Sequence, residues 1–199
     1  MLSKYMLVNI AWNHGGWARL EPNPKAGFGY ARNQGKGAFS PHESLNFYFP
    51  KKGIDTEDTV FGYFQTRGIP RRFENGGLIF FWSRSTDDGK GYFVGVYGNA
   101  VVLDKVKSWK YPGFENGEFW ANIRGEKKLS CLFPCPISDS SYVLNGKRLI
   151  YRANLSYDFD KKKALSLLKA AKNENCGKSS DSGAIATLTA IEEYVRNGL

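Results

Sequence analysis

The chain has 199 residues, of which 42% are hydrophobic; this is enough for one well-packed domain and argues against wholesale disorder. Lysine and arginine number 28 against 19 aspartate and glutamate residues, a net charge of +9 that favours an anionic partner such as nucleic acid, although basic surfaces also aid solubility. No basic tail carries this charge, so folding must assemble any positive face. Aromatic residues make up 15% of the chain, more than a core of this size needs, and some rings are expected to serve recognition.

Cysteine and histidine usage favours a reducing, cytoplasmic setting without a metal or other cofactor. The three cysteines are an odd number, and no signal peptide is recognisable, which argues against a disulfide scaffold. Cys131 and Cys135 lack a second ligand pair, and neither His14 nor His42 lies at metal-binding spacing. The longest apolar runs are too short to span a membrane, so no membrane partner is expected.

A strand is predicted first, at Tyr5–Ile10, from its aromatic and β-branched residues. A region rich in glycine, proline and asparagine then extends to Pro50 and carries the rings Trp12, Trp17, Phe28, Tyr30 and Phe39. Rings on a glycine-rich loop have little core to fill, which makes this region the first candidate for recognition. Thr56–Thr66 is predicted as a short helix or an edge strand, and Arg67–Arg72 as a basic turn.

A hairpin is predicted in the middle of the chain. Asn75-Gly76-Gly77 is a strong turn signal that precedes a strand at Leu78–Trp82. A second strand is expected at Tyr92–Leu103, with the charged loop Ser83–Gly91 between the two. Further strand-like segments follow at Phe119–Ile123 and Lys128–Phe133.

The C-terminal part of the chain is predicted to be helical. Asp158 and Asp160 can cap a helix over residues 161–172, and residues 173–183 are small and polar, as in a linker. After Ser182 a second helix is expected, with one apolar face formed by Ile185, Leu188, Ile191 and Val195. The predicted organisation is an α+β domain at 1–160, built on a curled sheet or small barrel with flanking helices, and a helical extension at 161–199.

The common catalytic motifs are absent from the sequence. Gly177-Lys178-Ser179 resembles the end of a phosphate-binding loop, but residue 172 is lysine where that motif requires glycine. There is no GxSxG or HExxH motif. His42 and Glu43 could act as an acid–base pair, although a capped turn with satisfied polar groups is the favoured explanation. We therefore expect a binding module rather than an enzyme, with a small nuclease or hydrolase as an alternative.

Two stretches resemble the PUA-like group of folds that includes EVE and YTH domains. One is the strand Tyr5–Ile10 followed by an aromatic loop, and the other is the run from Asn75 to Tyr97. A closer similarity, to the N-terminal domains of archaeal McrB-type modification-dependent restriction GTPases, is carried by Gly29-Tyr30-Ala31, the segment Pro41–Phe47, Phe133-Pro134 and Gly146-Lys147-Arg148. The Trp-Cys/Ser motif of YTH domains has no clear counterpart, so this resemblance does not say which ring takes its place.

The resemblance implies a specificity module that holds a flipped, modified base in an aromatic cage. It also implies double-stranded DNA as a partner, and a GTPase domain and a nuclease subunit of a restriction complex as further partners. N6-methyladenine is the first expectation for the mark, and 5-methylcytosine or a related cytosine mark the second. An RNA-binding module of the same fold is an alternative.

We expect the cage to be formed by three rings with two in reserve: Trp17, Tyr30 and Trp82, then Trp12 and Phe28. Hydrogen bonds to the base edge are expected from Asn9, Asn46 and Ser83. Phosphate contacts are expected from loop cations, namely Arg32, Lys36, Arg71, Arg72, Arg84 and Lys90. Each of these assignments has a simpler alternative: packing for the rings, hydrogen bonds within turns for the polar residues, and solvated surface charge for the cations. The remaining rings at Trp109, Trp120 and residues 47–49 are expected in the core.

Overall fold

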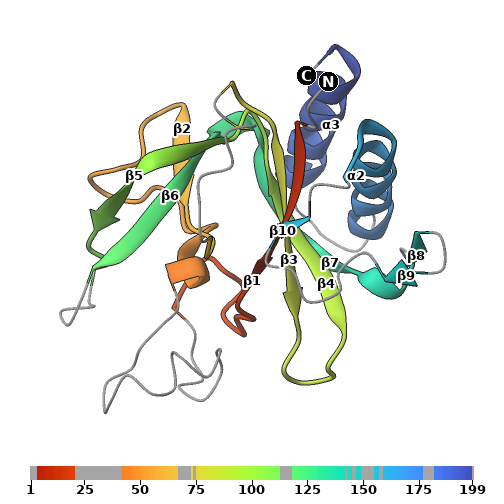
Figure 1. Cartoon of the computed structure of the whole chain (residues 1–199), viewed down its shortest axis with the longest axis horizontal. Helices are drawn as coiled ribbons and strands as arrows, with labels where there is room; N and C mark the ends of the chain where they lie inside the picture. Colours follow the sequence, from red (N-terminus) through yellow and green to blue (C-terminus); the bar gives the residue numbers. More distant parts are fainter. Residues whose placement is uncertain are drawn as a thin grey trace.

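The computed structural model describes residues 4–20, 42–66, 73, 75–112, 118–141, 143–144, 147–148, 155–156, 159–176 and 182–198. The molecule is an α+β protein. Figure 1 shows two helices on one side of a five-stranded sheet and a three-stranded sheet on the other side.

The five-stranded sheet has the order β10-β1-β3-β4-β7. Its strands are β1 (Tyr5–Ile10), β3 (Leu78–Arg84), β4 (Gly91–Tyr97), β7 (Ser130–Ser138) and β10 (Leu155–Ser156). β1 pairs in parallel with β3, and the other pairs are antiparallel. Both faces of this sheet are covered, which explains why β1 and β3 are apolar along nearly their whole length.

The three-stranded sheet has the order β2-β6-β5 and is antiparallel. It contains β2 (Thr59–Gly62), β5 (Val101–Trp109) and β6 (Phe119–Glu126). Of the two alternatives predicted for Thr56–Thr66, a short helix or an edge strand, the structure has the edge strand. Two short strands, β8 (Val143–Leu144) and β9 (Lys147–Arg148), pair separately, and the described residues form no closed barrel.

The single strand predicted at Tyr92–Leu103 is wrong. The chain forms two strands there, β4 and β5, which belong to different sheets. They are separated at residues 98–100, where Asn99 has a φ of 47°. This left-handed conformation is one that asparagine tolerates better than most residues, and it turns the chain from one sheet into the other.

The helices α2 (Lys161–Asn175) and α3 (Ser182–Arg196) pack on the five-stranded sheet. Asp160 caps α2, its Oδ1 accepting a hydrogen bond of 2.8 Å from the backbone N–H of Lys163, as predicted. The buried positions of both helices share one core with strands β1, β3, β4 and β7; they include Ala164, Leu167, Leu168, Ala171, Leu188, Ile191 and Val195. The segment predicted as an extension therefore covers one face of the sheet.

Short 3-10 turns connect some of these elements. The described ones are η1 (His42–Leu45), η3 (Lys127–Leu129) and η4 (Asp139–Ser141). The turn η1 matters most for the site. Figure 1 places it near the end of β1.

Tyr97 is expected to contribute strongly to stability, because its fully buried hydroxyl donates to the backbone carbonyls of Asn46 and Phe61 and so joins the two sheets. Tyr97→Phe should lower the free energy of unfolding by about 1–3 kcal/mol, since it leaves buried acceptors without a donor. Denaturant unfolding followed by circular dichroism would measure this loss. A variant as stable as the wild type would show that these bonds contribute nothing net.

Candidate functional site

Of the three predicted cage rings the structure describes Trp17 and Trp82, and it places them in different parts of the core. Trp17 packs with Ile10 and Phe81 in the core between the two sheets, whereas Trp82 packs in the core beneath the helices. Successive residues of a strand point to opposite faces, and Phe81 and Trp82 follow this rule. Tyr30 and Phe28 lie outside the described residues.

Trp82 is a core residue rather than the mouth of a pocket. It is only 7% exposed, and its indole N–H donates to Oδ2 of Asp139 at 3.2 Å. A side chain at Gly91 would begin 2.5 Å from its ring, so the neighbouring strand is already in close contact. This is a correction to its predicted role: β3 continues past Trp82 to Arg84, and the ring is buried.

The ring that reaches the surface at the end of β1 is Trp12. It is half-buried and lies 5.2 Å from Trp17, edge to face, and 5.7 Å from Tyr92, tilted by 43°. The ring of His14 lies 6.3 Å away, also edge to face. We call these four residues the Trp12 cluster. The indole N–H of Trp12 is buried and has no hydrogen-bond partner among the described residues.

The loop between β3 and β4 holds the outer members of the Trp12 cluster. Asp87 lies 2.9 Å from Nε2 of His14, and the hydroxyl of Tyr92 donates to Oδ2 of Asp88 at 2.7 Å. The Tyr92 hydrogen bond is the main cause that lowers the pKa of Asp88, and the same bond raises the pKa of Tyr92. The carboxylates of this loop therefore fix the rings around Trp12.

The inner wall of the cluster is fixed by backbone contacts. Trp17 has a φ of 54°, in the left-handed region that is unfavourable for a tryptophan. Its indole N–H donates to the carbonyl of Ala11 at 3.0 Å, and its own carbonyl accepts from the N–H of Phe47 at 2.8 Å. Asn13 donates to the carbonyl of Ser44 at 2.9 Å and so ties the cluster to η1. The hydroxyl of Ser44 is buried and, like the Trp12 N–H, lacks a partner among the described residues.

Two of the three predicted base-edge residues have backbone partners. The amide of Asn46 both accepts from the N–H of Tyr63 and donates to its carbonyl, at 2.8 and 2.9 Å. Ser83 donates to the carbonyl of Ile10 at 2.9 Å. Asn9 differs, because its buried Oδ1 has no partner in the described part of the chain. Asn9 is paired with Trp82 and lies on the helix side of the sheet, away from Trp17.

The predicted phosphate contacts are only partly described. Arg84 and Lys90 are exposed in the β3–β4 loop, where Asp87 and Asp88 offset their charge. Nε of Arg84 donates to the carbonyl of Gly89 at 2.9 Å. Arg32, Lys36, Arg71 and Arg72 lie outside the described residues. The described part of this loop therefore carries no net positive charge.

A second aromatic group lies on β6, where the sequence prediction placed only core residues. Trp120 is 48% exposed and stacks on His42, with ring centroids 4.6 Å apart and planes 15° apart. Tyr63 lies 5.1 Å from His42. The sequence contains a signal for this position. Alternation along β6 places Trp120 on the same face as the polar residues Asn122 and Arg124, which indicates a face outside the core. Trp109, by contrast, is buried as predicted.

His42 and Glu43 lie in different surroundings. His42 lies against Trp120, and burial lowers its pKa to about 4. Glu43 is buried, which raises the pKa of its carboxyl to about 7 despite hydrogen bonds from the backbone N–H groups of Glu43 and Gln65. Among the described residues, no group of three or more histidine, cysteine, aspartate or glutamate side chains is placed to hold a metal ion.

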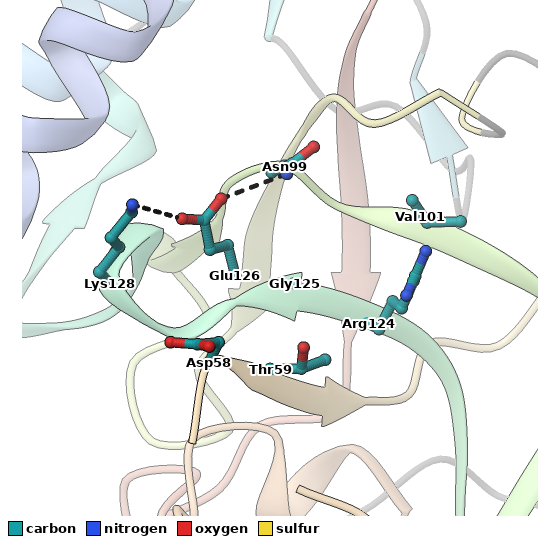
Figure 2. A pocket seen from close by; sticks show the side chains of 8 residues that line it. All are labelled: Asp58, Thr59, Asn99, Val101, Arg124, Gly125, Glu126 and Lys128. Carbon is teal, nitrogen blue, oxygen red and sulfur yellow. Dashed lines mark hydrogen bonds and ion pairs between the residues drawn. The ribbon is translucent and has the colours of Figure 1, made fainter. Parts of the chain in front are cut away.

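A polar pocket of about 400 Å³ lies where β2 begins and β6 ends (Figure 2). Glu126 accepts from Lys128 at 2.8 Å and from Asn99 at 3.2 Å, and Arg124 and Val101 line the other end. Its lining residues include no aromatic ring, so this pocket does not fit the predicted cage.

Comparisons with known proteins assign no family. A scan against protein-family models found no match, and searches of curated proteins and of solved structures found no significant match. Within the described residues, no helix is long and apolar enough to cross a membrane.

The burial of Trp82 leads to a prediction about stability. Trp82→Ala should lower the free energy of unfolding by about 3–5 kcal/mol, the range for removing a large core ring, and Trp12→Ala should cost less because Trp12 is half-buried. Urea unfolding of the two variants beside the wild type would measure both losses. Equal losses would contradict the assignment of Trp82 to the core and Trp12 to the surface.

The raised pKa of Glu43 leads to a prediction about pH. The folded state holds this proton more tightly than the unfolded chain, so its contribution to stability is present below pH 4.5 and is lost as the pH rises to about 7. Relative to the wild type, Glu43→Gln should therefore gain stability between pH 4.5 and 7, by at most about 3 kcal/mol. Denaturant unfolding of both proteins at pH 4.5, 6 and 8 tests this, and a constant difference would refute it.

Proposed function

We propose that the chain is a nucleic-acid-binding module that receives an extruded, modified base at the Trp12 cluster. The observation that carries this proposal is the indole N–H of Trp12, which is buried without a partner among the described residues although its ring is only half-buried. A buried donor without an acceptor is costly, and an acceptor atom on a ligand would satisfy it. The strained backbone of Trp17 beside it adds support, since such strain is concentrated at functional sites.

Energetics are compatible with a flipped base at this position. Removing a base from a duplex costs a few kcal/mol, and stacking on an aromatic side chain returns about 1–3 kcal/mol per base. Trp12 and Tyr92 offer two such rings, although at a centroid distance of 5.7 Å and a tilt of 43° the rings must both turn and move apart before a base can lie between them. A buried methyl group adds on the order of 1 kcal/mol, so strong discrimination also requires a close fit.

The resemblance to EVE and YTH domains refines the proposed module. It is a PUA-like domain that reads methylated double-stranded DNA, with N6-methyladenine as the first mark to test and a cytosine mark as the second. Its context is a modification-dependent restriction complex with a GTPase and a nuclease. The revised cage centres on Trp12, with Trp17 as a supporting wall instead of a stacking surface.

Binding measurements on Trp12 variants test the proposal. Fluorescence anisotropy with duplexes carrying N6-methyladenine, 5-methylcytosine or no mark should show one preferred mark. Trp12→Ala should weaken binding of that duplex by about ten- to a hundredfold, since it removes a stacking ring and a donor. Trp12→Phe is the matched control: it keeps a ring and removes the N–H, so it should lose less affinity.

Three outcomes would contradict parts of this proposal. Equal affinity for all duplexes would reject modified-base recognition. Tighter binding of matched RNA would replace the DNA assignment with an RNA-binding module. Cleavage of the duplex by the wild-type chain would support the nuclease alternative instead.

A further inference from the structure

The outer face of the three-stranded sheet combines an exposed ring with positive charge. Phe61 on β2 is paired directly with Arg124 on β6, so their side chains lie on the same face. Trp120 is four residues before Arg124 on the same strand and shares that face, about 13 Å away along the strand. The opposite face, with Ile123 and Val60, is buried in the core. We define the outer face by the exposed side chains Trp120, Arg124 and Lys107; Phe61 lies buried on the same side, with Nζ of Lys107 over its ring.

Trp120 forms a platform at one end of the outer face. One side of its indole lies against His42, and its backbone N–H donates to Nδ1 of His42 at 3.2 Å. Tyr63 contacts the same histidine from the edge. These contacts fix the orientation of a large ring that remains 48% exposed and is therefore accessible for stacking.

Positive charge continues from this platform along the strands. Nζ of Lys107 lies 4.4 Å from the centroid of the Phe61 ring, and Arg124 extends to the polar pocket (Figure 2). Residues 101–112 and 118–129 carry six basic side chains against three acidic ones. Residues 84–90, with two of each sign, have no such excess. The segments around β5 and β6 therefore carry a net positive charge, which the end of β3 and the β3–β4 loop do not.

We propose that the outer face is a second nucleic-acid contact, which binds an unpaired strand by stacking one base on Trp120 while Lys107 and Arg124 contact its phosphates. A stacking ring beside cations is the usual arrangement for binding single strands without sequence preference. The occupant is anionic, which matches the excess of basic side chains, and it is flat, which matches the ring. This contact does not require a modified base, so it does not rest on the function proposed for the Trp12 cluster.

The turn η1 connects the two binding regions. His42, at its start, supports Trp120, and the carbonyl of Ser44 accepts the hydrogen bond from Asn13, next to Trp12. A base that leaves a duplex requires the neighbouring pairs to open. An outer face that holds unpaired nucleotides would help to keep the strand open.

The test uses fluorescein-labelled unmodified oligonucleotides, dT12 and its RNA counterpart U12, titrated with the full chain. Trp120→Ala should weaken binding about ten- to a hundredfold, and Trp120→Phe should weaken it less. Lys107→Gln with Arg124→Gln should reduce the dependence of log affinity on log salt by about 0.7 for each phosphate that the variant no longer neutralises. Val106→Ala is the control, because Val106 is 54% exposed on β5 but has no ring or charge.

The variants distinguish the outer face from the Trp12 cluster. Trp120→Ala should lower affinity for methylated and unmethylated duplexes by the same factor, whereas Trp12→Ala should change their ratio. Equal loss for dT12 and U12 shows a general single-strand contact, and a larger loss for one identifies the strand type. Failure of the wild type to bind either oligonucleotide, or unchanged binding by Trp120→Ala, would overturn the inference and point to a protein partner for this face.

Discussion

The two sheets of this molecule meet at the side chain of Tyr97. Its ring packs edge to face against Phe47 and Phe81, and its hydroxyl donates to carbonyls of the chain before β2 and within β2. Burial raises its pKa well above the ordinary value, so the group remains a donor over the whole physiological range. Gly62 and Gly125 face it, and a side chain at either position would begin about 3 Å from Tyr97. This contact sets the position of the three-stranded sheet against the five-stranded one, and both proposed binding regions depend on that position.

The surplus of aromatic residues has a largely structural explanation. Rings fill the junction between the sheets around Tyr97, and a smaller group around Trp109 packs under β5 and β6. Such rings bury large areas and prefer the edge-to-face contacts seen throughout this core. Within the part of the chain that the structure describes, the rings around Trp12 and around Trp120 reach the surface. Recognition is therefore assigned to these two groups rather than to the aromatic content as a whole.

Folding also determines which charged side chains contribute to the positive charge of the surface. Lys51 is buried, and its Nζ donates to the carbonyls of Asn46 and Tyr48 at 3.3 and 2.8 Å. Burial lowers its pKa to about 7, with the nearby Asp55 carboxylate opposing the shift, so the formal net charge of +9 counts a cation that is not fully charged at neutral pH. The loop cations Arg84 and Lys90 are offset by acids, whereas β5 and β6 retain an excess. A count along the sequence cannot separate these cases.

The sequence by itself determined the local elements: the strands β1 and β3, the cap of α2 and the apolar face of α3. Each depends on a short-range pattern of alternation, capping or helical spacing, which neighbouring residues carry. Tertiary structure alone decided that Tyr92–Leu103 divides between two sheets, and that Trp17 and Trp82 face opposite sides of one sheet. It also decided that, among the described tryptophans, Trp12 and Trp120 reach the surface. These outcomes depend on which residues distant in the chain cover a given side chain, and the composition of a segment does not contain that information.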